Sequence, residues 1–300
     1  MEHLLHHYPD YNTTQYCISS LKARHPQINV LSFGKSVYGR PLRCLCLGNM
    51  RSPLLFVGGV HGSEYQTVSA TLILAQTLTQ PEWSHILRKQ GVLIVPCLNP
   101  DGTELFINGV ATAPNPDQAL KLCEGNTLNW KANGRGIDLN RNFDFYFSKS
   151  VRMAKRAHIT RPGPTRYGGT HAFSEPETKA LRHLCYAYQP CAMLCLHSQG
   201  EEIYADANGY YPPKGQQIGK MLENISGFKL CRPNNQASFA GAKDWFIHAF
   251  NKPGFTIEMG LGENPLPLST CQNNIDRALP ILLSLIVYKA SDIPTVLCYN

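Results

Sequence analysis

The segment Leu54-Leu55-Phe56-Val57-Gly58-Gly59-Val60-His61-Gly62-Ser63-Glu64 joins an apolar run to a turn that carries a histidine and a glutamate. Its first four residues predict a buried strand, and residues 64–79 have apolar side chains at the spacing of one helix face. His61 and Glu64 are therefore expected between a strand and a helix, where open α/β sheets bind ligands. Imidazole and carboxylate groups are ordinary zinc ligands, but a catalytic zinc needs a third ligand from elsewhere in the chain. On its own, the pattern also fits a surface histidine beside a helix-capping acid.

Length and composition favour an ordinary α/β protein. The chain has 300 residues, of which 43% are hydrophobic, and this is enough for a full core. The sequence contains no linker, repeat or low-complexity segment, so residues 1–300 are expected to form one catalytic domain. Its 11 cysteines are an odd number, and several fall in predicted strands. Buried reduced thiols therefore explain them better than a disulfide framework.

The formal charge of +7 comes largely from residues 149–166, which we interpret as a solvated helix and loop. No nucleic-acid motif accompanies these basic residues, so nucleic acid is not an expected partner. The N-terminus lacks the basic start and apolar segment of a secretory signal, and the apolar stretch 279–288 is too short to span a membrane. A cytoplasmic protein is expected, with export by a non-standard route as the alternative.

The remaining sequence alternates between strand and helix patterns. Strands are expected near residues 30–33, 42–47, 92–97, 191–197 and 254–258, and helices near residues 13–24, 176–188, 214–224, 241–250 and 275–288. Local signals predict a cap at Thr13 or Thr14, a turn at residues 99–102, a long loop at 109–136, and a capping box between Ser174 and Glu177. The alternation predicts a mixed, largely parallel twisted sheet with helices on both faces.

Two further predicted strands end in titratable residues. His197 follows an apolar strand and is the third ligand candidate, although a lone histidine there also fits a hydrogen-bonded core position. Glu258 ends the strand at 254–258. Residues 135–143 carry arginines and asparagines, whose side chains suit a carboxylate ligand, although capping asparagines in a solvated loop fit the pattern too.

In this order, His61-x-x-Glu64, Asn140-Arg141, His197 and Glu258 resemble the zinc metallocarboxypeptidase family over about residues 11–288. Further segments, at 168–169, 173–178, 197–204 and 243–247, are similar to the bacterial branch that cleaves γ-D-glutamyl-diaminopimelate bonds in cell-wall peptides. The resemblance implies one zinc ion per chain and a zinc carboxypeptidase-like fold.

The resemblance also implies a role for each matching residue. His61, Glu64 and His197 would hold the zinc, and Glu258 would be the general base. Asn140 and Arg141 would bind the terminal carboxylate of the substrate. The family uses a further arginine to polarise the scissile carbonyl, and Arg135 is the nearest candidate, although the alignment is ambiguous across residues 131–136.

Substrate contacts are expected from three more positions. Lys243 corresponds to the floor of the leaving-residue pocket, where a lysine favours a side chain that ends in a carboxylate; a lysine that extends to solvent is the alternative. Gln236 replaces the tyrosine that digestive members of the family carry over the pocket, so only a contact role is expected. Ser198, directly after His197, is the third.

The leading hypothesis is a zinc peptidase that hydrolyses the γ-D-glutamyl-diaminopimelate bond of murein peptides, which in the cytoplasm would serve muropeptide recycling. The alternative is a metallocarboxypeptidase that removes acidic C-terminal residues through α-peptide bonds. An amidase of the same zinc architecture and a catalytically silent wall-peptide binder fit the motifs less well. The partner is expected to be a small peptide, and the sequence does not determine the oligomeric state.

Overall fold

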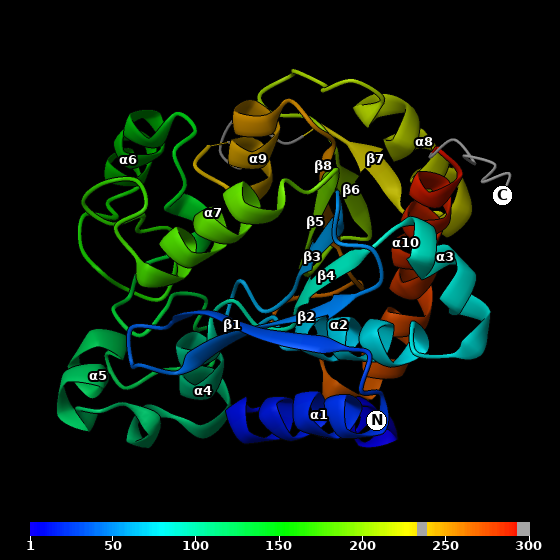
Figure 1. Ribbon diagram of the computed structural model, residues 1–300. Helices are drawn as coiled ribbons and strands as arrows, with labels where there is room; N and C mark the ends of the chain where they lie inside the picture. Colours follow the sequence, from blue (N-terminus) through cyan, green and yellow to red (C-terminus); the bar gives the residue numbers. More distant parts are fainter. Residues whose placement is uncertain (233–238, 293–300) are drawn as a thin grey trace, which may run out of the picture.

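The computed structural model describes residues 1–232 and 239–292 (Figure 1). In these residues the strands form an eight-stranded sheet in the order β1-β2-β4-β3-β5-β8-β6-β7. The strands are β1 (Asn29–Lys35), β2 (Pro41–Leu47), β3 (Leu54–Val57), β4 (Val92–Val95), β5 (Ala192–His197), β6 (Glu202–Tyr204), β7 (Lys229–Cys231) and β8 (Gly254–Glu258).

The helices lie mainly between the strands. They are α1 (Tyr11–Arg24), α2 (Gln66–Thr77), α3 (Ser84–Lys89), α4 (Pro100–Asn108), α5 (Pro116–Cys123), α6 (Phe147–Arg156), α7 (Pro176–Tyr188), α8 (Gly215–Ser226), α9 (Ala242–Phe250) and α10 (Cys271–Ser291). Short 3-10 helices are η1 (Glu2–Leu5), η2 (Pro81–Trp83), η3 (Val110–Thr112), η4 (Leu139–Arg141) and η5 (Leu268–Thr270).

The centre of the sheet is parallel and its edges contain antiparallel pairs. β4, β3, β5 and β8 run in the same direction, so their carboxyl ends share one edge. β1 and β2 form the expected antiparallel pair, β2 is antiparallel to β4, and β6 is antiparallel to β8. The fold-class prediction of a mixed sheet with a parallel centre is confirmed.

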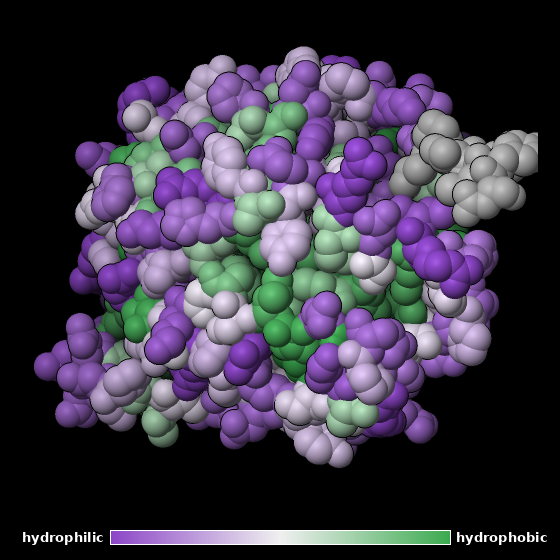
Figure 2. All heavy atoms as spheres, viewed as in Figure 1, coloured by the Kyte–Doolittle hydropathy of each residue, from purple (hydrophilic) through white to green (hydrophobic). Residues whose placement is uncertain are grey.

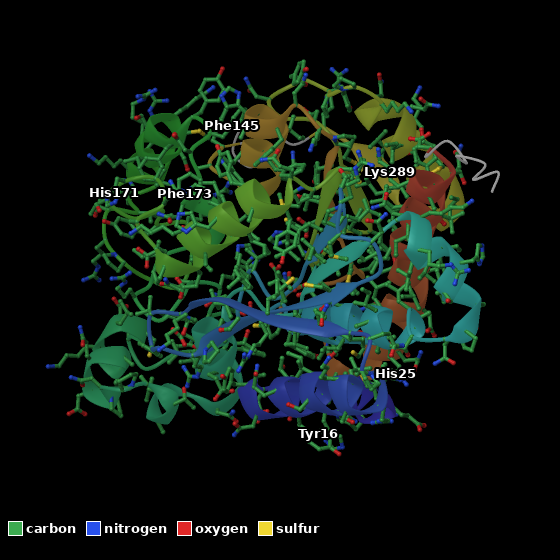
Figure 3. All side chains as sticks on the ribbon, in the orientation of Figure 1. Tyr16, His25, Phe145, His171, Phe173 and Lys289 are labelled. Atoms are coloured by element: carbon green, nitrogen blue, oxygen red, sulfur yellow. The ribbon has the colours of Figure 1, made fainter. Side chains whose placement is uncertain are left out.

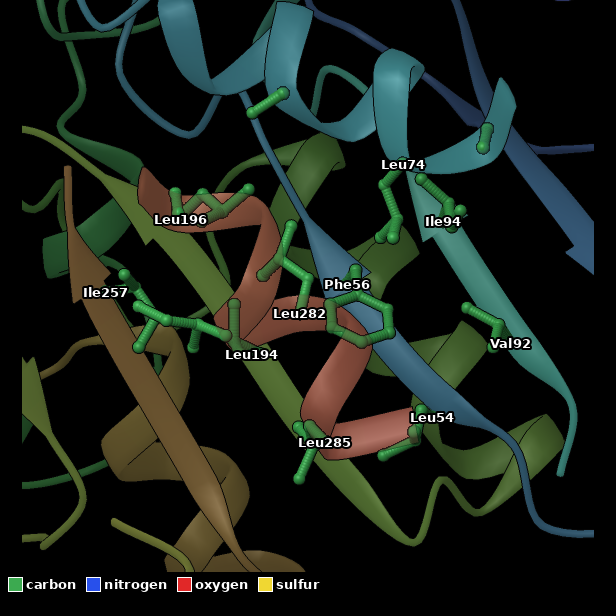
Figure 4. Close-up of a cluster of buried hydrophobic side chains, with 14 of the residues drawn as sticks. Leu54, Phe56, Leu74, Val92, Ile94, Leu194, Leu196, Ile257, Leu282 and Leu285 are labelled. Carbon is green, nitrogen blue, oxygen red and sulfur yellow. The ribbon is translucent and has the colours of Figure 1, made fainter. Parts of the chain in front are cut away.

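Helices cover both faces of the sheet because alternate side chains of each strand point to opposite faces. Leu54 and Phe56 of β3 pack into one core with side chains of α1, α2, α8 and α10, whereas Leu55 and Val57 pack into a second core with α7 and α9. Figure 4 shows the first core, in which Phe56 lies beside Leu282 of α10. The outer surface in Figure 2 is mainly hydrophilic, with hydrophobic patches near the middle of the view.

Two predicted local signals are wrong because asparagine, aspartate and proline serve in both turns and helix caps. The N-cap of α1 is Asp10, whose side chain accepts a hydrogen bond from the amide of Thr13 at 2.7 Å, so neither Thr13 nor Thr14 is the cap. The segment 99–102 begins α4 and is not a turn. Asn99 caps this helix by accepting from the amide of Gly102 at 2.9 Å, and a proline occupies its first turn.

Two more local predictions are corrected in the same way. The segment 109–136 is not one long loop, since η3 and α5 interrupt it, and Asn115 caps α5. The cap of α7 is Glu175 instead of Ser174, and no capping box forms. The hydroxyl of Ser174 donates to a carboxylate oxygen of Glu175 at 2.8 Å, while Glu177 accepts from the amide of Val37 at 2.9 Å.

Several expectations about the chain as a whole can be compared with the structure. The cysteines in its described part are all free, as expected for reduced thiols. Part of the basic segment forms the helix α6, as expected. No helix among residues 1–232 and 239–292 combines the length and apolar character that crossing a membrane requires. Outward-facing side chains include Tyr16 of α1, which is 67% exposed (Figure 3).

Candidate active site

The sheet brings three chain segments to one place at the carboxyl edge of its parallel strands. Val57, the last residue of β3, is in register with Cys195 of β5, and His197 at the end of β5 is in register with Glu258 at the end of β8. His61 lies in the turn between β3 and α2, as the sequence predicts. Residues that are far apart in the sequence therefore meet at this edge.

His61, Glu64 and His197 form a compact cluster of potential metal ligands. Their ligand atoms lie within 4.8 Å of one another, and all three side chains are buried. The Nδ1 atoms of His61 and His197 each lie 2.9 Å from a different carboxylate oxygen of Glu64. Two imidazole nitrogens and one carboxylate are a known ligand set of catalytic zinc, in which a fourth position is left for water. The chemistry of these donors therefore fits a zinc ion.

Asp138 orients His61 and is a residue that the sequence analysis missed. Its Oδ1 atom lies 3.2 Å from Nε2 of His61, while its Oδ2 atom accepts from the amide of Arg166 at 2.8 Å. An Nε2–H that donates to a carboxylate leaves the lone pair of Nδ1 available for a metal. The carboxylate two positions before Asn140 was the only sequence signal for it.

Glu258 lies in the same hollow as the ligand cluster. Burial raises the pKa of its carboxyl group to about 8, and the negative charge of Glu64 raises it further, while Lys131 and His61 oppose the shift. A carboxyl group with a pKa in this range can accept and return a proton near neutral pH. The geometry is thus compatible with the general-base role that the resemblance implies.

Asn140, Arg141 and Ser198 also line the hollow. The Nδ2 atom of Asn140 lies 3.4 Å from Nε2 of His197, and Nη1 of Arg141 donates to the carbonyl oxygen of Phe239 at 3.2 Å. Ser198 donates through its hydroxyl to Asn264 Oδ1 at 2.7 Å. These contacts hold the side chains at the wall of the hollow.

Aromatic packing anchors the segment that carries Asn140 and Arg141. The ring of Phe143 lies 5.5 Å from that of Phe173 and 5.6 Å from that of Trp245 in α9. Figure 3 labels Phe173 on the side of the molecule where α7 lies. Such ring pairs stabilise more than their buried area alone, so the segment has a fixed position beside the sheet.

The structure places Arg135 outside this hollow. Its guanidinium is half exposed and binds Glu175 at 3.0 Å, and it lines a different surface hollow with Tyr38. Lys131, four residues earlier, lines the hollow of the ligand cluster instead, with its Nζ atom 2.7 Å from Glu64 Oε1. Burial lowers the pKa of Lys131, but the charge of Glu64 raises it more, so the side chain stays cationic.

Lys243 lies in the wall of the hollow and not in solvent, because it is only 5% exposed. Its ammonium donates to the carbonyl oxygen of Asp206 and to Oδ1 of Asp244. Gln236, the remaining expected contact, lies outside the described residues.

The hollow has a volume of about 300 Å³. Its remaining lining comes from β6, β8 and two loops. These residues are Gln199, Glu202, Tyr204, Asp244, Thr256 and Asn264.

The sequence pattern of the zinc carboxypeptidase family matches residues 14–279. The chain therefore belongs to the zinc carboxypeptidase family and is a zinc metallopeptidase. This membership agrees with the ligand cluster and identifies zinc as the cofactor.

Relatives within the family include bacterial enzymes. The chain is 30% identical over 292 residues to the gamma-D-glutamyl-L-diamino acid endopeptidase 1 of Lysinibacillus sphaericus, and the match covers 92% of this chain and 71% of the relative. It is 28% identical over 168 residues to murein peptide amidase A of Escherichia coli K12, covering 55% of this chain and 57% of the relative. Bovine thrombin-activatable fibrinolysis inhibitor shares the fold, with a TM-score of 0.77 at 18% identity over 97% of this chain and 100% of that chain.

Proposed function

We propose that residues 1–300 form one catalytic unit that hydrolyses the bond between the γ-carboxyl group of D-glutamate and diaminopimelate in murein peptides. The observation that carries the proposal is the hollow in which His61, Glu64 and His197 meet Glu258 and the buried cation of Lys243. The similarity to relatives named for a γ-D-glutamyl bond and for murein peptides supports the choice of substrate. Buried free thiols, which persist in reducing compartments, support a cytoplasmic place of action.

In this proposal the residues of the hollow bind the leaving residue and hold its peptide bond in place. Asn140 and Arg141 bind the α-carboxylate of diaminopimelate through amide and guanidinium donors. Lys243 contacts the carboxylate at the far end of its side chain. Fixing a substrate at both ends in this way lowers the barrier by converting an encounter into a step within one complex.

The chemical step divides between metal and protein. A zinc ion bound to His61, Glu64 and His197 supplies Lewis acidity and lowers the pKa of a water molecule to about 7. Glu258 accepts a proton from the attacking water at a carboxylate oxygen and later donates it to the leaving amine nitrogen. The ammonium of Lys131 donates a hydrogen bond to the scissile carbonyl oxygen, the role expected earlier for Arg135.

The test is incubation of zinc-loaded protein with L-Ala-γ-D-Glu-diaminopimelate, with free diaminopimelate measured by chromatography. We expect release of diaminopimelate by the native protein and none by a Glu258→Gln variant that retains its zinc. Absence of release from the native protein with zinc bound would exclude this substrate. Equal activity of native protein and variant would exclude Glu258 as the base.

The alternative function is removal of acidic C-terminal residues through α-peptide bonds, which Lys243 favours equally well. A panel of peptides that differ only in α- or γ-linkage to the leaving residue distinguishes the two functions. The proposed enzyme cleaves the γ-linked members faster, whereas an acidic carboxypeptidase prefers the α-linked ones.

A further inference from the structure

The wall of the active-site hollow contains a polar pair on β6 that the proposed reaction does not use. Glu202 and Tyr204 share one face of this strand, and Ile203 between them points into the apolar core on the other face. In the antiparallel register Glu202 lies opposite Glu258, and Tyr204 lies opposite Thr256. All four side chains line the hollow.

The carboxylate of Glu202 has no cationic partner within the described chain. None of the ion pairs among residues 1–232 and 239–292 includes it. The remaining segments, 233–238 and 293–300, contain no lysine, arginine or histidine that provides one. Its hydrogen bond comes from the hydroxyl of Tyr204, which donates to Oε2. A half-buried carboxylate of this kind is a site for a positive group.

Tyr204 keeps its proton and therefore stays a hydrogen-bond donor to Glu202. Burial raises the pKa of its hydroxyl, and the negative charge of Glu202 raises it further. The hydroxyl holds Glu202 against the wall, so the carboxylate is already positioned before a ligand enters. An ammonium that binds there loses less conformational freedom than one that must order a mobile side chain.

Lys243 provides the complementary charge in the same hollow. Its ammonium carries three N–H donors, and two of these are used by Asp206 and Asp244. The third is available for a carboxylate that enters the hollow. The lining therefore offers one group for a ligand cation and one for a ligand anion.

We infer that Glu202 and Tyr204 bind an ammonium group at the far end of the leaving residue's side chain, while Lys243 binds the carboxylate beside it. This inference rests on the proposed function and narrows it. The side-chain end of diaminopimelate carries an ammonium and a carboxylate on one carbon, so it matches both groups. An acidic residue has only the carboxylate, and lysine has only the ammonium, so each leaves one wall group without its partner.

The test uses zinc-loaded protein and γ-D-glutamyl peptides that end in diaminopimelate, in 2-aminopimelate, which lacks the far amino group, or in lysine. We expect kcat/KM for the diaminopimelate peptide to exceed that for the 2-aminopimelate peptide by roughly 10- to 100-fold. In a Glu202→Gln variant this ratio should fall close to one. Tyr204→Phe, which keeps the ring and removes the hydroxyl, should lower the ratio by a smaller factor.

A matched control is Glu201→Gln, because it removes one negative charge next to Glu202 without touching the hollow. Glu201 pairs with Arg277 at 2.8 Å and does not line the hollow. This variant should keep the native ratio. An unchanged ratio in both Glu202→Gln and Tyr204→Phe would overturn the inference while leaving the γ-glutamyl activity intact.

Calorimetric titration with free diaminopimelate and free 2-aminopimelate gives a second readout that needs no turnover. Native protein should bind diaminopimelate more tightly, and Glu202→Gln should bind the two about equally. If no γ-linked peptide is cleaved, the proposed function fails, and the titration still decides the role of Glu202. Equal binding of both compounds by native protein would refute the ammonium site.

Discussion

Replacing Asp138 with asparagine should weaken zinc binding without unfolding the protein. Asp138 is 3% exposed and accepts hydrogen bonds from the amides of Asn140 and Arg166 at 3.0 and 2.8 Å. Its carboxylate also fixes the tautomer of His61 through the 3.2 Å contact with Nε2. An asparagine has nearly the same shape but only one acceptor oxygen, so one of these donors faces an NH₂ group.

The expected loss follows from the position of the contact. If the amide NH₂ faces His61, the ring must present Nε2 as an acceptor and carry its proton on Nδ1, the atom directed toward Glu64 and the metal. Loss of an orienting carboxylate of this kind typically lowers metal affinity by about 10- to 100-fold, equivalent to about 1.4 to 2.7 kcal/mol. We expect the zinc affinity of Asp138→Asn to fall within this range.

The assay is competition for zinc against a chromophoric chelator at constant pH, with circular dichroism to verify the fold. Asp117→Asn on the exposed side of α5 is the matched control and should keep the native affinity. A folded Asp138→Asn protein that binds zinc as tightly as the native one would refute the orienting role.

Two further predictions concern charge in and near the site. Lys131→Met should retain zinc and lower kcat/KM on the γ-linked tripeptide by about 100- to 1000-fold, because the oxyanion loses a donor; activity close to native would refute this. Burial raises the pKa of Glu177 to about 8, so the folded state keeps a proton that the unfolded state loses above its value of 4.5. Stability therefore falls as the pH rises through this window, and between about pH 5.5 and about pH 9 the free energy of unfolding should drop by about 1 to 3 kcal/mol more for native protein than for Glu177→Gln. Denaturant titrations at both pH values measure this, with exposed Glu82→Gln as control, and equal pH dependence of native protein and the Glu177 variant would contradict it.

The periodicity of the sequence was sufficient for the strands and helices of the core. Four consecutive apolar residues at 54–57 or the apolar run at 191–197 can be buried on both faces only within a covered sheet, so their assignment needed no tertiary information. The local punctuation was less reliable. Asn99-Pro100 fits a turn and a helix start equally well, and the choice depends on what the following residues pack against.

The ligand motif was also visible in the sequence, because His61 and Glu64 are three residues apart and His197 and Glu258 each end an apolar strand. Contacts between distant residues were not. Asp138 and His61 are 77 positions apart, and only the folded chain shows that their side chains meet. The same holds for Lys131, which faces Glu64 while Arg135 points to Glu175.

Sequence alone thus determined the elements and the metal-binding residue types, because these depend on local spacing and on the chemistry of single side chains. Tertiary structure decided which charges share the hollow, including the pairing of Glu202 with Tyr204 opposite Glu258 and Thr256. The physical reason is that strand periodicity assigns side chains to two faces, but only strand order and helix packing decide which face surrounds the substrate.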